Sequence, residues 1–263
     1  MNATELYRAG RVNEAIDAAQ QDVKRQPAET GKRLQLAQLL LFAGQWTRAD
    51  KQLEVVSMQD PEMAVGIALL RQLVRGEVAR QQFFDEGRSP SFLKDDDPLV
   101  RLHLEAAVAV RDQRPAEAVE LLRQSEEQTI SIAGTCNEKS FVGLRDLDDL
   151  LGPVLEAITP NGKYYWINMN SICSIEFHKP EQLHDLVWRR ATTEIQDGPQ
   201  GDIYVPVLYA GSHTHEDELI RLGRKTDWTA EEPVRGVGQR ELLVGEEAVP
   251  IMEIEHLALS SQR

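Results

Sequence analysis

Two stretches of this chain repeat each other at an offset of 34 residues. Gly10 aligns with Gly44, Ala15 with Ala49, and Pro27 with Pro61. This is the spacing of tetratricopeptide repeats, in which each unit is a pair of antiparallel helices. Glycine ends the first helix of a pair because it accepts the left-handed conformation, and proline prevents the second helix from continuing. Alanine lets the two helices approach closely. The N-terminal region is therefore predicted to be a stack of helical hairpins, an architecture suited to binding another protein.

Continuing the same frame predicts about four helix pairs. The first two cover residues 3–26 and 30–60, the third begins after Pro61, and the fourth covers 99–126. The third pair keeps a glycine at its turn, Gly76, but has Gln81 where alanine is expected. The fourth has Gln113 in the glycine position and Ala118 in the alanine position. The repeat pattern is therefore strong in pairs one and two and weak in pairs three and four.

An acidic run, Asp95-Asp96-Asp97, stands directly before Pro98 and the fourth pair. Aspartate is a favoured helix N-cap, and proline is favoured in the first turn of a helix. The run is therefore predicted to be a capped helix start. Cation ligands would normally be spaced further apart.

In a helical repeat of this kind the first helix of each pair lines the concave side. The frame places these residues there: Leu34, Gln38, Leu41 and Phe42; Leu70, Leu73 and Val74; His103, Ala107 and Val110. Such an apolar groove with scattered polar groups suits the apolar face of an amphipathic helix. The alternative is that these side chains are core, or that the C-terminal half packs into the groove. His103 is expected to be a hydrogen-bonded groove residue and neither a metal ligand nor a base.

The net charge of the chain is −14, and residues 141–263 carry −10 of it. A surface this acidic repels phosphate backbones and anionic lipids, so binding to nucleic acid or to a membrane surface is not expected. No apolar run approaches the ~18 residues that span a bilayer. The first ten residues, MNATELYRAG, show no basic-then-apolar signal segment. Cys136 and Cys173 are expected to be buried thiols, although a disulfide between them stays open. We expect a cytoplasmic protein.

After residue 140 the pattern changes from helical to mostly extended. A helix is predicted over 144–158 and a short one over 180–186. Strands are predicted over 163–167, 171–178, 188–196, 202–209, 240–244 and 249–259, with turns at Asn161-Gly162 and Asp197-Gly198. Strands without regular alternation with helices indicate a mostly antiparallel α+β domain. The fold class is thus α+β in two parts, with a helical repeat domain at 1–135 and an α+β domain at 140–263.

Two short motifs in the C-terminal half could indicate a metal site or a nucleotide-binding loop. His213 and His215 have a spacing that permits a metal on one face of a strand, but they stand in a loop before Glu216 and Asp217. Gly236-Val237-Gly238 is predicted to be a tight turn, because the third glycine of a dinucleotide loop is missing.

Other side chains of this half have structural interpretations. Asp185 with Arg189 and Arg190 is interpreted as a structural ion pair, in preference to a site that binds a substrate anion. Trp166, Trp188 and Trp228 are predicted to be core or interface anchors. No cofactor is expected.

Six segments of the chain appear together in the order found in one protein family. They are LGPVLEAI (151–158), KYYWI (163–167), DLVWRRAT (185–192), YVPVLY (204–209), GRKTDW (223–228) and GVGQRELLVGEE (236–247). With the helical repeats before them, they resemble the ImpE/SciE/TagJ family of accessory proteins of bacterial type VI secretion systems. The chain departs from the family pattern at Asn168-Met169 and at Arg190.

The resemblance implies a non-enzymatic accessory protein. It implies as partner the N-terminal helix of the small contractile-sheath subunit, with the AAA+ ATPase that recycles the sheath as a possible second partner. Two alternatives stay open. One is an enzyme that uses Asp185, Arg189 and the 213–215 histidines of the C-terminal domain. The other is a scaffold that dimerises through aromatic patches.

Overall fold

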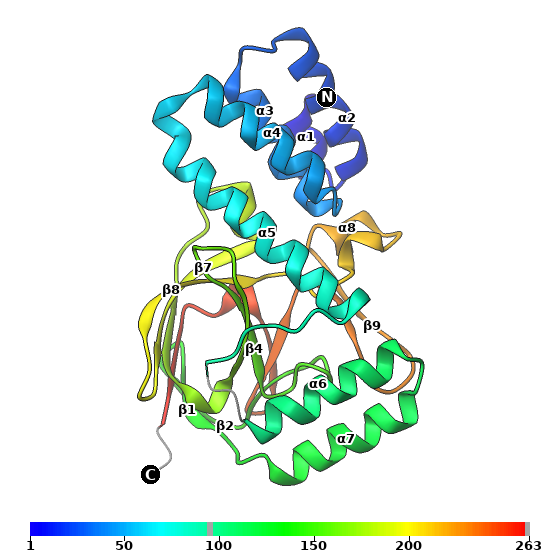
Figure 1. The fold of residues 1–263 in the computed structure, drawn as a ribbon, viewed down its shortest axis with the longest axis vertical. Coiled ribbons are helices and arrows are strands. Elements are labelled where there is room, and N and C mark those ends of the chain that lie inside the picture. Colours follow the sequence, from blue (N-terminus) through cyan, green and yellow to red (C-terminus); the bar gives the residue numbers. More distant parts are fainter. Residues whose placement is uncertain (94–96, 261–263) are drawn as a thin grey trace.

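The computed structural model of the chain describes residues 1–93 and 97–260. The helices are α1 (Ala3–Arg8), α2 (Val12–Arg25), α3 (Thr30–Phe42), α4 (Trp46–Gln59), α5 (Ala64–Glu86), α6 (Pro98–Arg111), α7 (Pro115–Gln128) and α8 (Glu218–Arg221). Short 3-10 turns are η1 (Pro61–Met63), η2 (Met169–Ser171), η3 (Leu183–Leu186), η4 (Ser212–Thr214) and η5 (Ile251–Glu253). Figure 1 shows α1–α4 at one end of the molecule, the sheets with α6 and α7 at the other, and α5 running between them.

The strands form one large sheet and two small ones. The first strands are β1 (Ala133–Cys136), β2 (Lys139–Val142), β3 (Leu144–Asp146), β4 (Val154–Ile158), β5 (Tyr164–Asn168), β6 (Ile172–Phe177) and β7 (Trp188–Ile195). The others are β8 (Gln200–Pro206), β9 (Thr226–Trp228), β10 (Gly236–Gly238), β11 (Glu241–Val244), β12 (Glu247–Pro250) and β13 (His256–Leu259). The large sheet has the order β2-β1-β13-β6-β7-β8-β4-β5, and its strand pairs are antiparallel. The α+β class predicted from the sequence is therefore confirmed.

The first two repeat units fold as their spacing predicts. Gly10 and Gly44 adopt φ values of 82° and 65°, the left-handed geometry that ends α1 and α3. Ala15 and Ala49 are fully buried between the paired helices, where a larger side chain would hold them apart. Sequence reasoning placed these turns correctly because both signals are local.

The third unit does not form a hairpin, so the predicted turn at Gly76 is wrong. Helix α5 continues through this residue and ends at Glu86, followed by Gly87 in the left-handed conformation. A Cβ atom at Gly76 would lie 2.4 Å from Ile158 Cγ2 of β4. The glycine therefore serves close packing of a helix on a sheet, a tertiary requirement that the repeat frame does not contain.

The fourth unit is a hairpin, but it lies away from the first two. Gln113 takes φ 58° between α6 and α7, and Ala118 is fully buried, as the frame predicts. Asp97 caps α6 through the amides of Leu99 and Val100, which confirms the capped start at that residue. The predicted participation of Asp95 and Asp96 lies outside the described residues. Figure 1 shows α6 and α7 beside the sheets, at the opposite end of the molecule from α1–α4.

The helix predicted over 144–158 is wrong, because this segment forms β3, a turn and β4. All five residues of β4 are buried, since β4 is paired on both sides and α5 lies against it. A strand covered in this way is apolar throughout and loses the alternation that marks a half-exposed strand. Its apolar run therefore looks helical in the sequence.

The remaining strand predictions agree with β5, β6, β7, β8 and β11 to within a few residues. The turn at Gly162 (φ 79°) joins β4 to β5 as predicted, and the short helix over 180–186 is η3. The single strand predicted over 249–259 is interrupted by η5 and so becomes β12 and β13. Gly236–Gly238 is itself a short strand that pairs with β9, so the predicted turn there is wrong.

Strand β1 ends at Cys136, so the large sheet begins on the N-terminal side of the predicted boundary at 135–140. The division into domains at that point stays a prediction. Among residues 1–93 and 97–260, no helix is both long enough and apolar enough to cross a bilayer.

Candidate functional site

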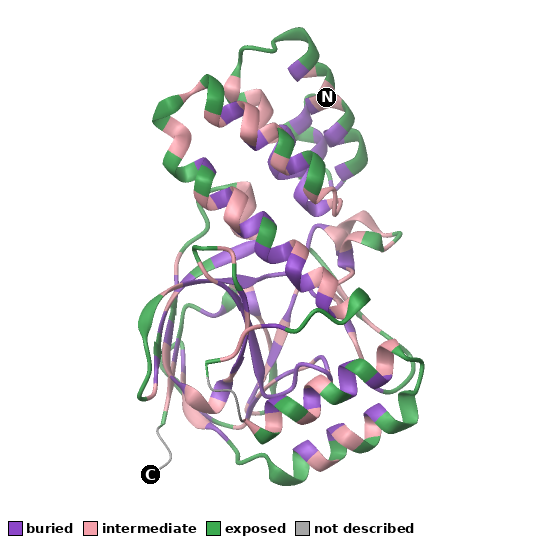
Figure 2. Cartoon of the chain, viewed as in Figure 1, coloured by how far each residue is buried: buried purple, intermediate pink, exposed green. Residues whose placement is uncertain are grey.

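The predicted groove residues are covered by the chain itself. Eight of the ten are buried, namely Gln38, Leu41, Phe42, Leu70, Leu73, Val74, His103 and Ala107, and the other two, Leu34 and Val110, are partly buried. Figure 2 shows buried positions along α5 where this helix crosses above the sheets. The prediction that these side chains line an open groove is therefore wrong. That they contact a partner stays a prediction.

The C-terminal half closes the concave side of the repeats. Gln38 Nε2 lies 2.9 Å from His184 Nδ1 of η3. Trp46, at the start of α4, has ring centroids 6.5 Å from Trp188 and 5.8 Å from His213. The alternative interpretation of the groove, as an intramolecular contact, is thus the one that the structure adopts. Trp166 and Trp188 are core residues as predicted, whereas Trp228 is only half-buried.

His103 of α6 is held by two hydrogen bonds in a buried position. Its Nδ1–H donates to the carbonyl of Leu150 at 2.9 Å, and its Nε2 lies 2.9 Å from Ser125 Oγ of α7. Because a carbonyl can only accept, Nε2 is left as the acceptor for the serine hydroxyl. Burial lowers the pKa of His103 to about 4, so the ring is neutral near pH 7. The prediction of a hydrogen-bonded residue is confirmed.

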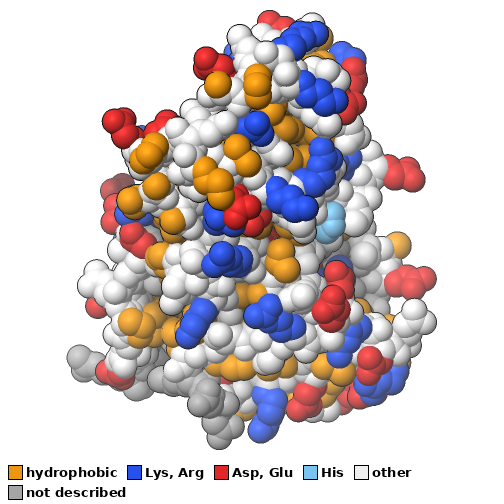
Figure 3. Space-filling view, turned by 45° about the horizontal axis from the view of Figure 1, so that its top comes forward, with side chains coloured by type: hydrophobic (Ala, Val, Ile, Leu, Met, Phe, Trp, Pro, Cys, Tyr) orange, Lys and Arg blue, Asp and Glu red, His pale blue; other side chains and the backbone are white. Residues whose placement is uncertain are grey.

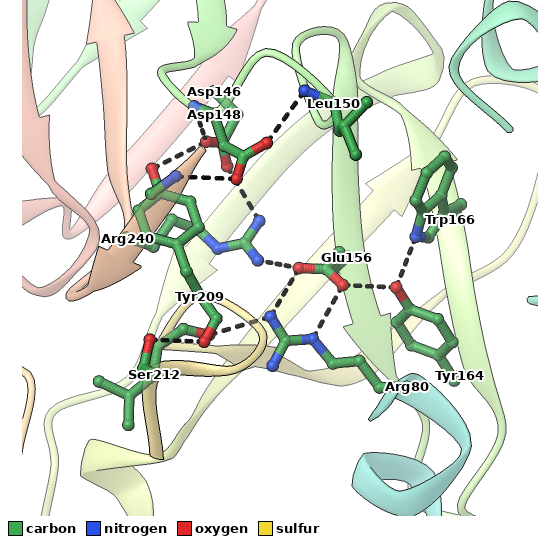
Figure 4. A network of polar contacts seen from close by, with 12 residues as sticks. Arg80, Asp146, Asp148, Leu150, Glu156, Tyr164, Trp166, Tyr209, Ser212 and Arg240 are labelled. Carbon is green, nitrogen blue, oxygen red and sulfur yellow. Dashed lines mark hydrogen bonds and ion pairs between the residues drawn. The ribbon is translucent and has the colours of Figure 1, made fainter. Parts of the chain in front are cut away.

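The most polar part of the interior joins α5 to the sheets through buried ionic groups (Figure 4). Arg80 of α5 donates to both carboxylate oxygens of Glu156 of β4, at 2.8 and 2.9 Å. It also pairs with Glu77 one turn earlier, at 3.0 Å. Trp188 Nε1 donates to the second oxygen of Glu77 at 2.8 Å. All four side chains are 3% exposed or less.

Arg240 extends this network toward β3. Its guanidinium donates to Glu156 and, at 3.0 Å, to Asp146. Asp146 also accepts from the hydroxyl of Tyr209 at 2.9 Å and from the amide of Asp148 at 2.9 Å. Two arginines therefore share Glu156, and Asp146 balances the second of them.

The pKa values of the two buried carboxylates, Glu156 and Asp146, are shifted in opposite directions. Burial opposes ionisation of Glu156, but the two guanidiniums outweigh it and lower its pKa to about 2. Burial and, to a smaller extent, the like charge of Asp148 nearby raise the pKa of Asp146 to about 7, although Arg240 acts to lower it. These groups pair with one another and none is exposed, although Arg240 Nε is buried without a hydrogen-bond partner among the described residues. The paired groups hold α5 on the sheets, because breaking a buried ion pair is costly.

Sequence reasoning did not single out this network, although one signal for it was present. Glu156 is a charged residue in the middle of an apolar strand, and glutamate is almost never fully buried without a partner. That pattern indicates a buried cation. It does not indicate which one, because Arg80 lies 76 residues away and Arg240 lies 84 away.

The catalytic candidates of the sequence do not converge. Asp185 accepts from the backbone amides of Glu181 and Gln182, and it caps η3. Arg189 instead donates to backbone carbonyls, including those of Ile251 and Ile254. Arg190 forms its ion pair with Asp202 of β8, at 2.6 Å, so the predicted ion pair exists with a different carboxylate.

The histidine pair is also separated by its contacts. His213 packs against Trp46, and His215 Nδ1 accepts from the amide of Asp217 at 3.0 Å. Within the described part of the chain, no group of three His, Cys, Asp or Glu side chains is placed to hold a metal ion. The two cysteines, Cys136 and Cys173, are free thiols, the first buried and the second half-buried.

An open cleft of about 500 Å³ lies between α7 and the strands β3 and β11. Its apolar lining comprises Val119, Leu122, Ile130, Ile132, Leu144, Pro153, Pro233 and Leu243. Ile130, directly after α7, is 62% exposed. His103 and Ser125 also contribute to the lining. Arg145 pairs across the cleft wall with Asp149 at 2.8 Å and with Glu126 at 3.3 Å. An apolar cleft with a charged rim is the common form of a binding site.

Comparison with known proteins places this architecture in a family. A family model described as ImpE protein matches residues 138–258. The type VI secretion system accessory component TagJ of Pseudomonas aeruginosa is 35% identical over 229 residues, which cover 87% of this chain and 81% of that protein. The crystal structure of protein VPA1032 from Vibrio parahaemolyticus superimposes with a TM-score of 0.91 at 28% identity, over 99% of this chain and 98% of that one.

The fold and its junction define a class of protein in which a short helical repeat is joined by one long helix to an antiparallel α+β part. The chain belongs to the ImpE/TagJ family. The residues that the family model matches include Asp146, Glu156 and Arg240, whereas Arg80 lies outside them.

Proposed function

We propose that this protein is a cytoplasmic accessory component of a type VI secretion system and acts by binding other proteins of that system. The 35% identity with TagJ over most of both chains supports this role. The geometry favours a binding role over a catalytic one, because the candidate catalytic side chains of Asp185 and Arg189 are hydrogen-bonded to backbone groups.

The partner we propose is the N-terminal amphipathic helix of the small sheath subunit, with the sheath-recycling AAA+ ATPase as a second partner. An amphipathic helix binds by placing its apolar face in a hydrophobic groove. The concave side of the repeats is filled by the chain itself, so the apolar cleft beside α7 is the better surface for such a helix. The single observation that supports this assignment is the apolar lining of that cleft, where Val119 and Leu243 are half-buried and Ile130, at its edge, is 62% exposed.

Titration calorimetry with a synthetic peptide of the sheath subunit's N-terminal helix tests the proposal. Ile130→Asp puts a charge into the apolar contact and is expected to weaken binding about tenfold or more, equivalent to about 1.4 kcal/mol. Val65→Asp is the matched control, since Val65 is 84% exposed and stands at the start of α5, outside the residues that line the cleft. It should leave the affinity unchanged.

The outcomes separate the partner from the surface. If the peptide does not bind the wild-type protein, the proposed partner is wrong. If it binds and Ile130→Asp has no effect, the partner stands and the cleft is not its site. Circular dichroism of both variants checks that neither substitution has unfolded the protein.

A further inference from the structure

A second groove, of about 560 Å³, lies between α4, α5 and the tip of the β4–β5 hairpin. Trp46 at the start of α4 forms part of its wall, and the half-buried Val78 of α5 adds apolar surface, whereas Val74 beneath them is only 3% exposed. Gly162 at the hairpin tip closes the groove, where the chain lies tightly against the backbone of Gln72. The groove thus draws on both ends of the molecule.

Two arginines in this groove have no carboxylate partner among the described residues. Arg75 makes its hydrogen bond to the side chain of Gln72, at 3.4 Å, and Arg88 makes one to Gln82, at 2.7 Å. Both are exposed. The one acidic residue among those that line the groove, Asp50, is already bound to Arg71 at 2.7 and 3.0 Å. The groove therefore carries a surplus of positive charge.

This surplus stands out because the chain as a whole has a net charge of −14. Figure 3 shows Lys and Arg side chains along the middle of one face of the molecule, with most of the acidic side chains toward its margins. Such a local field of opposite sign to the whole molecule favours a negatively charged partner at this place and selects against others.

The side chains of the groove define what the partner must present. Guanidinium groups bind carboxylates with two parallel hydrogen bonds, and Trp and Arg are the residues most enriched at binding hot spots. Trp46 is half-buried, and its ring is held by Trp188 and His213. It therefore offers a rigid apolar surface beside the two cations.

From this geometry we infer that the groove binds an acidic segment of a partner protein, in which Asp or Glu side chains pair with Arg75 and Arg88 while an aliphatic side chain contacts Trp46. This surface is separate from the cleft beside α7 and does not depend on the partner proposed for that cleft. A nucleic acid would also present negative charge, but the acidic remainder of the surface repels a long phosphate backbone.

The test uses the full chain and a fluorescein-labelled peptide of alternating Glu and Leu, with fluorescence anisotropy as the readout. The double variant Arg75→Glu/Arg88→Glu is expected to lose at least about tenfold in affinity. The matched control is Lys24→Glu/Arg25→Glu, which reverses two exposed charges of α2 and gives the same net charge. It should change the affinity less than about twofold, because the contact and not the overall charge is responsible.

Three results would overturn the inference. They are an equal loss of affinity in the two double variants, equal binding of a peptide in which Lys replaces Glu, and tighter binding of a single-stranded oligonucleotide of the same charge. The conservative variant Arg75→Lys/Arg88→Lys adds a further distinction. It keeps the charge but loses the bidentate geometry, and its affinity is expected to fall between wild type and the Glu variant.

Discussion

The two halves of α5 place arginines of the same helix in opposite situations. Arg75 is exposed and bonded to a glutamine, whereas Arg80, five residues later, is 2% exposed and bound by Glu77 and Glu156. The difference arises where the helix meets the sheet. A guanidinium that loses its water must find carboxylates within the fold, whereas one that keeps its water need not. The half of α5 after Gly76, here called the buried half, therefore serves the contact with the sheets. The half before Gly76, here called the exposed half, buries Ile67, Leu70, Leu73 and Val74 on one side but leaves Arg75 on its other side available to a partner.

The largest expected loss of stability comes from removing the carboxylate that binds Arg80 in the buried half of α5. Glu156→Gln leaves Arg80 and Arg240 facing each other without the charge between them. Removal of one member of a buried ion pair costs about 3–5 kcal/mol of the free energy of unfolding. Urea denaturation measures this loss directly. Arg75→Gln, in the exposed half, should stay within about 0.5 kcal/mol of wild type, and an equal cost for both variants would contradict the comparison.

The stability that the buried Glu156 contributes should depend on pH. The folded-state pKa of Glu156 is about 2 and its ordinary value is 4.5. A lowered pKa means that the contribution is present above pH 4.5 and is lost as the pH falls from 4.5 toward 2, by an amount on the order of 3 kcal/mol. Free energies of unfolding measured across that range should fall less steeply for Glu156→Gln than for wild type. An unchanged slope would show that Glu156 does not titrate in this way.

Substitution of Gly76 tests the point at which α5 comes into close contact with β4. Alanine here gains helix propensity but puts a Cβ 2.4 Å from Ile158 Cγ2, so the net effect is expected to be a loss of about 1–3 kcal/mol. Thermal denaturation of Gly76→Ala should show a lowered midpoint. A raised midpoint would mean that β4 moves away from the helix at little cost.

The smallest effect is expected from the matching change in the exposed half. A Cβ at Gly66 meets nothing within 4 Å. Gly66→Ala should therefore stabilise the protein by about 0.5–1 kcal/mol through helix propensity alone. The opposite signs of the two Gly→Ala substitutions within one helix make the pair a sensitive measure of where the sheet contact begins.

Several expectations from the sequence are confirmed where they depended on near neighbours. The turns at Gly10, Gly44 and Gly162 follow from left-handed backbone geometry, and the cap at Asp97 follows from its position before Pro98. The same reasoning failed at Gly76, where the contact that matters is with Ile158. It also failed at β4, where burial on all sides removed the alternation that identifies a strand.

For the candidate sites, too, the sequence predicted local features but not the contacts between distant segments. The repeat frame located the helices that carry Leu41 and Leu70, but it did not show that both side chains are buried within the chain. The cleft beside α7 and the groove with Arg75 and Arg88 arise from segments far apart in the chain, and neither has a motif of its own.

By itself the sequence determined the helical hairpins, most of the strands and the family. Each of these is encoded by steric and hydrogen-bonding preferences that act over a few residues, or by motifs kept in order. The tertiary structure alone decided that α5 runs on into the sheet, that Arg80 and Arg240 share Glu156, and which surfaces stay open. These outcomes depend on which distant segments exclude water from one another, and a linear pattern does not contain that information.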